Sequence, residues 1–170
     1  MYKYLISIII IIMLCIVLPA TAQDAIYQYG KIIDDMDSAE IHREQNDLSE
    51  VLDTVNKGEY FLILSIKDGW ANIMTLENVT GYVHDISVNV KGKSCGIGTI
   101  STDNTLHVPL YMAPSFGSPR SDVVTDGDRV IVICYASDVG IDEMGNIVVT
   151  RFGTRGYLNS RYLRTYFPKE

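Results

Sequence analysis

The feature that most constrains the fold is a series of short apolar strands and turns that occurs twice along the chain. Residues 60–66 are rich in β-branched and aromatic side chains, end at the turn Lys67-Asp68-Gly69, and are followed by a second apolar run at 70–74. The same order returns at residues 129–135 and 147–152. Repeated strands of this kind, with no helical periodicity between them, predict an all-β chain with an internal repeat.

The two copies can be aligned on their turns. Lys57-Gly58-Glu59 matches Asp126-Gly127-Asp128 at an offset of 69, and Thr80-Gly81-Tyr82-Val83 matches Arg155-Gly156-Tyr157-Leu158 at an offset of 75. A longer hairpin from Ala136 to Asn146 absorbs the difference, because hairpin tips tolerate insertions. The glycine-rich residues 91–97 between the copies predict a linker. We therefore expect two modules, at residues 29–90 and 98–168.

The N-terminal 22 residues are typical of a secretory signal peptide. Lys3 is followed by an apolar run at residues 4–18 and by the small-residue cleavage site Ala20-Thr21-Ala22, so the mature chain is expected to begin at Gln23. A retained signal anchor is the alternative, although about 16 apolar residues fall short of the roughly 20 that span a bilayer. The expected location is periplasmic or secreted, with no stable membrane insertion after cleavage.

The charge of the chain excludes some partners. The net charge is -7, which argues against nucleic acid and anionic lipid because both would be repelled. Residues 23–90 carry 13 acidic and 4 basic side chains, whereas residues 97–170 carry 8 and 7. This asymmetry indicates two units with different surfaces, or an acidic face that only keeps an exported domain soluble.

Two cysteines, Cys95 and Cys134, remain once Cys15 is removed with the signal. A disulfide between them would close a loop of 39 residues and contribute about 3–4 kcal/mol in the chain-entropy model. The alternative is a buried thiol at Cys134, which follows an apolar strand and would pack like any small apolar group. Two cysteines without a nearby histidine do not form a zinc site.

Six motifs of the first copy, in order, resemble those of the bacterial SH3 (SH3b) family. They are Gly30-Lys31-Ile32-Ile33-Asp34-Asp35-Met36-Asp37, Ile41-His42-Arg43, Ser49-Glu50-Val51-Leu52, Lys57-Gly58-Glu59, Asp68-Gly69-Trp70 and Gly81-Tyr82-Val83-His84. The resemblance implies two small SH3-like barrels in tandem in an exported bacterial protein. It also implies a groove that binds peptidoglycan peptides.

The candidate binding residues lie in the loops and strands that would form this groove. Arg43 stands in the segment where the family has N-V-R, and the second copy has Tyr111 and Met112 there without an arginine. Tyr111 is the stronger candidate because tyrosine supplies a large amphipathic contact surface. Trp70, Tyr82 and Tyr157 are expected to close the barrel cores, with ligand contact as the alternative.

The residues that could support catalysis form no convincing arrangement. His42, His84 and His107 show no metal-binding spacing and no neighbouring cysteine, so each is expected to be an ordinary strand or loop residue. Asp34, Asp35 and Asp37 lack the rest of a calcium loop. The arginines at 151, 155, 161 and 164 fit solvated strand edges. We expect no catalytic residues, metal or cofactor, and hence no enzyme.

Two functions remain. The first is a non-catalytic exported protein that recognises a cell-wall peptide or glycan, in peptidoglycan or elsewhere in the envelope. The second is an inhibitor or immunity factor that binds a secreted or periplasmic protein, such as a cell-wall-directed toxin or enzyme. The family resemblance favours the first function, and the acidic first module favours the second.

Overall fold

The computed structural model describes residues 27–103, 107–134 and 145–166. The predicted signal peptide at residues 1–22 lies outside these ranges, as does most of the hairpin predicted between Ala136 and Asn146. Within the described ranges, no helix is both long and apolar enough to cross a bilayer.

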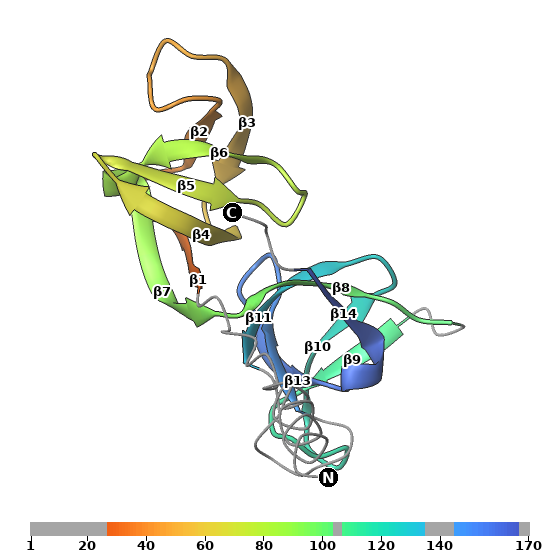
Figure 1. Cartoon of the computed structure of the whole chain (residues 1–170). Helices are drawn as coiled ribbons and strands as arrows, with labels where there is room; N and C mark the ends of the chain where they lie inside the picture. Colours follow the sequence, from red (N-terminus) through yellow and green to blue (C-terminus); the bar gives the residue numbers. More distant parts are fainter. Residues whose placement is uncertain (1–26, 104–106, 135–144, 167–170) are drawn as a thin grey trace, which may run out of the picture.

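The chain is all-β and forms two seven-stranded antiparallel sheets, one after the other along the sequence (Figure 1). The strand order of the first sheet is β3-β2-β6-β5-β4-β1-β7, and that of the second is β10-β9-β13-β12-β11-β8-β14. The second order equals the first with seven added to each strand number. The prediction of two tandem β modules is therefore confirmed.

The elements of the first module are β1 (Tyr27–Ile32), β2 (Ser38–His42), β3 (Val51–Asn56), β4 (Tyr60–Lys67), β5 (Trp70–Met74), β6 (Thr80–His84), the 3-10 turn η1 (Asp85–Ser87) and β7 (Val88–Ser94). Those of the second are β8 (Gly96–Ile100), β9 (His107–Tyr111), β10 (Arg120–Thr125), β11 (Arg129–Cys134), β12 (Asn146–Val149), β13 (Arg155–Leu158), η2 (Ser160–Tyr162) and β14 (Leu163–Tyr166).

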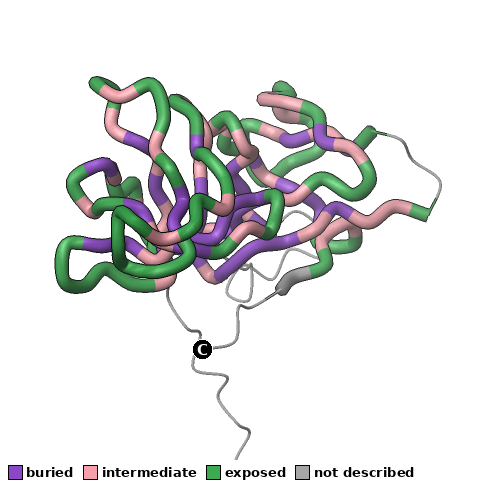
Figure 2. The backbone as a smooth tube through the Cα atoms, turned by 90° about the horizontal axis from the view of Figure 1, so that it is seen from above, coloured by how far each residue is buried: buried purple, intermediate pink, exposed green. Residues whose placement is uncertain are grey.

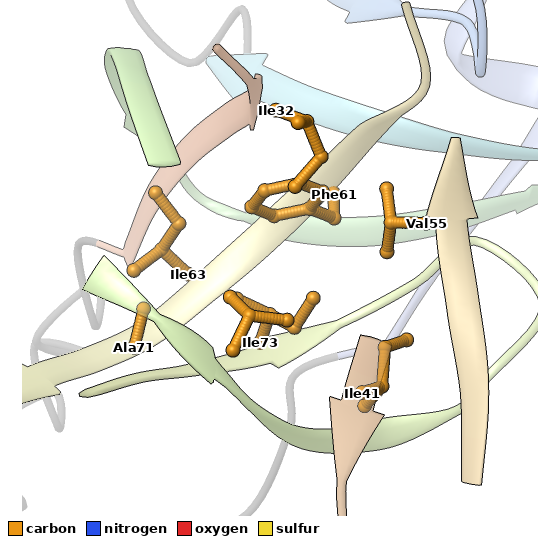
Figure 3. Packing of buried hydrophobic residues seen from close by; sticks show 8 residues of the cluster. Ile32, Ile41, Val55, Phe61, Ile63, Ala71 and Ile73 are labelled. Carbon is orange, nitrogen blue, oxygen red and sulfur yellow. The ribbon is translucent and has the colours of Figure 1, made fainter. Parts of the chain in front are cut away.

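Each module has its own apolar core, built from one face of its strands. Successive side chains of a strand point to opposite faces, so one face of each strand lines the core, while central strands such as β4 are buried on both faces. Figure 3 shows the first core, where Phe61 and Ile63 of β4 lie beside Ile73 of β5. Figure 2 shows buried backbone running along the interior of both modules. The second core contains Ile100, Val108, Leu110, Val124, Val130, Val148 and Leu158.

The turns on which the two copies were aligned have matching conformations. Gly58 and Gly127 both have φ of +85°, in the left-handed region that glycine adopts without steric cost. The acidic residue that follows each glycine accepts a hydrogen bond from the backbone amide three residues earlier, at 3.0 Å for Glu59 and 2.7 Å for Asp128. The alignment therefore pairs structurally equivalent residues.

Residues 91–97 differ from the predicted linker. All but Cys95 belong either to β7, which ends at Ser94 and pairs with β1, or to β8, which begins at Gly96 and pairs with β11. The glycines there permit close packing. A Cβ on Gly92 would lie 3.0 Å from the Tyr29 ring, and one on Gly98, just after this segment, would overlap the side chain of Leu163. The glycine-rich composition of residues 91–97 predicted a flexible linker because the packing of these glycines against distant strands cannot be read from the sequence.

The modules pack against each other through equivalent positions. Leu62 and Met74 of the first module join Ile131 and Val149 of the second in one apolar cluster. Leu62 corresponds to Ile131 at the offset of 69, and Met74 to Val149 at the offset of 75. This shared cluster shows that the two sheets bury apolar surface together.

Arg151 connects the modules at the edge of this cluster. Its Nε donates to Glu59 Oε1 at 2.9 Å, its Nη1 lies 2.5 Å from Glu77 Oε1, and its carbonyl accepts from the backbone N–H of Tyr60 at 2.8 Å. The expectation that Arg151 is part of a solvated strand edge is therefore wrong. Its guanidinium instead bridges two carboxylates of the other module.

Candidate functional site

The outer face of the first sheet carries a group of aromatic and polar side chains on three adjacent strands. His42 of β2 is opposite Tyr82 of β6, which is opposite Asn72 of β5. Trp70 of β5 is opposite His84 of β6. Their sequence neighbours Ile41, Ala71, Ile73 and Val83 are buried in the core, so alternation directs these five residues outward. We call His42, Trp70, Asn72, Tyr82 and His84 the histidine face.

Trp70 lies between the two imidazoles of the histidine face. The His84 ring stacks on the indole with ring centroids 4.1 Å apart and an interplanar angle of 28°. The His42 ring meets the indole edge-on at 5.7 Å and 79°. Trp70 is only 9% exposed, yet it belongs to none of the three apolar clusters. Trp70 is thus one of the buried hydrophobic residues, as expected, and the His42 and His84 rings are among the groups that cover it.

A loop between β2 and β3 supplies the polar partner of His84. Asp47 Oδ1 lies 2.7 Å from His84 Nε2. The ends of the loop are joined by a hydrogen bond from the Arg43 N–H to the Glu50 carbonyl at 2.9 Å. The loop conformation thus holds a carboxylate beside the imidazole that stacks on Trp70.

Two buried polar atoms of the histidine face have no hydrogen-bond partner among the described residues. They are His42 Nδ1 and Asn72 Oδ1. The His42 side chain is 8% exposed, and its Nε2 is 3.7 Å from a carboxylate oxygen of Glu40. An unsatisfied buried polar group costs about 1–3 kcal/mol, so these two atoms lower the stability of this part of the sheet.

Arg43, a predicted site residue, is exposed and paired within its own loop. Its Nε lies 2.7 Å from Glu50 Oε2. The hydrogen bond and the charge of Arg43 lower the pKa of Glu50, and those of Glu50 raise the pKa of Arg43. Arg43 therefore borders the histidine face with its charge already neutralised.

The second module has different side chains at the equivalent positions. Tyr111, which corresponds to His42, is opposite Tyr157 of β13, which corresponds to Tyr82. Tyr111 also meets Phe116 edge-on, with ring centroids 5.9 Å apart. Met112 is 64% exposed beside them. The strand register thus brings the predicted residues Tyr111 and Tyr157 together, with the predicted residue Met112 next to Tyr111 in sequence. We call Tyr111, Met112, Phe116 and Tyr157 the tyrosine face.

The expectation that Tyr82 and Tyr157 close the cores is wrong. Both are partly exposed and lie outside the apolar clusters, because they alternate with the core residues Val83 and Leu158. The alternative prediction for Tyr82 and Tyr157 was contact with a ligand, and their partial exposure outside the cores leaves room for such a contact.

Sequence reasoning missed the roles of His42 and His84, which it treated as ordinary residues, and did not single out Asp47. The alternation Tyr82-Val83-His84 could have indicated that Tyr82 and His84 share the outer face. The contact of Asp47 with His84 spans 37 residues, and no local pattern signals it.

The acidic and cysteine residues form no metal site in the described ranges, where no group of three or more His, Cys, Asp or Glu side chains could hold an ion. Asp34 instead pairs with Lys31, which lowers its pKa. The backbone N–H of Cys95 donates to the Val132 carbonyl at 2.8 Å, which places Cys95 beside β11. The side chain of Cys134 lies outside the described part, so the disulfide stays a prediction.

A cavity of about 400 Å³ lies between the modules, beside the Arg151 bridge. Leu76 and Glu77 line it from the first module, and Asp122, Val123 and Phe152 are among the lining residues from the second. Its walls include the ion pair of Arg151 with Glu77. We interpret the cavity as part of the module interface.

The chain was compared with known families, proteins and structures. No family model matches it, and no curated protein matches it. Two similar solved structures are NlpC1 and NlpC2 from Trichomonas vaginalis, each with 15% sequence identity and a TM-score of 0.37 over 82% of this chain. The match covers 46% of NlpC1 and 48% of NlpC2, so this chain corresponds to less than half of each. These similarities are too low to show a family.

Proposed function

We propose that this chain is a non-catalytic, exported binding protein of the bacterial envelope, built from two SH3b-like modules. In this proposal the histidine face recognises a cell-wall peptide. The observation that carries it is Trp70 held between the rings of His42 and His84. Export rests on the N-terminal apolar segment and its Ala20-Thr21-Ala22 site.

The chemistry of the histidine face supports recognition of a peptide. A peptide backbone offers both N–H donors and carbonyl acceptors, which suits the exposed side chains of His84 and its partner Asp47. The aromatic rings supply flat apolar area that is ordered at low entropic cost.

The side-chain contacts of the two histidines are with carboxylates, at 2.7 Å for His84 and 3.7 Å for His42. A histidine that activates a nucleophile lies within hydrogen-bond reach of a hydroxyl or thiol. In the described part of the chain the polar contacts of His84 and His42 are with the carboxylates of Asp47 and Glu40. The Asp47–His84 pair thus orients a ring that packs on Trp70.

Co-sedimentation with purified bacterial sacculi tests the proposal. We expect wild-type protein to pellet with sacculi, and His84→Ala to pellet about tenfold less, because the substitution removes the stacked ring. His107→Ala is the matched control, since His107 is exposed on β9 of the other module. Absence of wild-type protein from the pellet, or equal retention of both variants, would contradict the proposal.

The second candidate, binding of a cationic protein, is favoured by the loop that carries Asp47. Leu48 at its tip is 93% exposed and is flanked by Glu44, Asp47 and Glu50, all exposed. An apolar side chain within an acidic surface suits a partner with a basic rim. Such a complex would weaken as salt rises from about 0.1 M to about 1 M, whereas retention on a neutral peptide would change little.

A further inference from the structure

The tyrosine face occupies the positions of the second module that are equivalent to the histidine face. The residues that lie opposite one another across its strands differ in chemistry from those of the first module. In the first module Val51, His42 and Tyr82 are directly opposite one another on β3, β2 and β6. In the second, Arg120, Tyr111 and Tyr157 occupy the corresponding row on β10, β9 and β13. An apolar residue at the end of the row is thus replaced by an arginine.

Apolar side chains are exposed on this part of the second module. Phe116 is 55% exposed and contacts Tyr111 edge-on, and Met112 is more exposed still. Tyrosine, phenylalanine and methionine are enriched in the buried centres of interfaces. Exposed together at one end of a sheet, they indicate a contact surface.

Two arginines border these side chains. Arg120 is directly opposite Tyr111, and Arg155 lies two residues before Tyr157 on β13, hence on the same side of the strand. Both are exposed, and in the described residues neither forms an ion pair with a carboxylate. The nearest acidic residue along β10, Asp122, is opposite the core residue Leu110 and lines the cavity between the modules.

The chain has a net charge of -7. Two unpaired arginines beside exposed aromatic side chains therefore make this part of the surface locally positive on an otherwise acidic protein. Arginine binds carboxylates through charge-assisted, often bidentate hydrogen bonds. We infer that the tyrosine face, with Arg120 and Arg155, binds an acidic peptide segment in which carboxylates flank an aromatic side chain. This site is separate from the histidine face and does not depend on the proposed function.

A matched pair of peptides tests the inference on the full chain. The probes are acetyl-Glu-Phe-Glu-Phe-amide and acetyl-Gln-Phe-Gln-Phe-amide, which differ only in carboxylate and carboxamide groups. We expect the acidic peptide to bind at least about tenfold more tightly in calorimetry. Arg120→Gln and Arg155→Gln should each weaken it by about tenfold, whereas Arg164→Gln, an exposed arginine that donates to Ser101 Oγ, should leave it unchanged.

Three results would overturn the inference. They are equal affinity for both peptides, the absence of saturable binding up to about 10 mM, and equal effects of all three arginine variants. Fluorescence of Trp70 locates the peptide, because the chain has one tryptophan and it lies on the histidine face. Unchanged Trp70 fluorescence supports a site on the second module, and a saturable change would place the peptide on the first module and refute the inference.

Discussion

His84 stacks on Trp70 with ring centroids 4.1 Å apart, although the two residues lie on different strands. The contact covers an indole on the outer face of a sheet, where solvent would otherwise reach it. The carboxylate of Asp47 hydrogen-bonds to Nε2 of the His84 imidazole. The stack and the loop therefore support each other, and changes to one should be measurable at the other.

Replacement of Trp70 tests how much the stack contributes to the fold. The indole is only 9% exposed, so Trp70→Ala should lower the free energy of unfolding by about 3–5 kcal/mol. Urea denaturation measures this change, and Trp70→Phe should retain most of the stability. A loss below about 1 kcal/mol would show that the ring is effectively on the surface.

The pair Arg43–Glu50 predicts a pH effect of known sign. Hydrogen bonding to Arg43, and its charge, lower the folded-state pKa of Glu50 below the ordinary value of 4.5. The pair therefore stabilises the fold above pH 4.5, and this contribution is lost as pH falls through the lowered pKa. Carboxyl NMR of Arg43→Gln should show Glu50 titrating closer to its ordinary value. Asp34, whose pKa is lowered by Lys31, should be unaffected and is the internal control.

Arg151 should link the stabilities of the two modules. Arg151→Met removes the partner of Glu59, whose side chain is 13% exposed, so the free energy of unfolding should fall by about 1–3 kcal/mol. Glu77→Gln, at the more exposed end of the bridge, should have little effect. A double-mutant cycle of Arg151→Met with Glu59→Gln should show coupling, and strict additivity would exclude a functional bridge.

The strands and turns were largely predictable because their signals are local. Strand β5 has the bounds that its apolar run predicts, and Asp68 and Gly69 adopt the left-handed conformation expected of a tight turn. The repeat offsets identified equivalent residues because the turn chemistry at Gly58 and Gly127 is the same in both copies.

The candidate site was only partly predictable because it depends on pairing between distant strands. Trp70 and Tyr82 were named from sequence, but the positions of His42 beside Tyr82 and of His84 beside Trp70 follow from the register of β2, β5 and β6. Residues 91–97 were predicted to be a linker for the same reason. Glycine in a sequence indicates a flexible backbone, and its role in close packing is recognised only when its neighbours in space are known.

The cysteine pair gives a prediction that mass spectrometry can check. Cys95 lies beside β11, the strand that ends at Cys134. We expect the protein from an oxidising compartment to resist alkylation at both thiols until it is reduced, and reduction should cost about 3–4 kcal/mol of stability. Alkylation of both cysteines without reductant would show that the bridge does not form.

The central claim, that the histidine face is the binding surface, is tested most directly by the fluorescence of Trp70. Soluble cell-wall peptides released from sacculi would be titrated into wild-type protein, His84→Ala and the His107→Ala control. The account predicts a saturable change in Trp70 emission for wild type and His107→Ala, and about tenfold weaker binding for His84→Ala. If calorimetry shows saturable binding of these peptides while Trp70 emission does not change during the titration, the claim that they bind at the histidine face is contradicted.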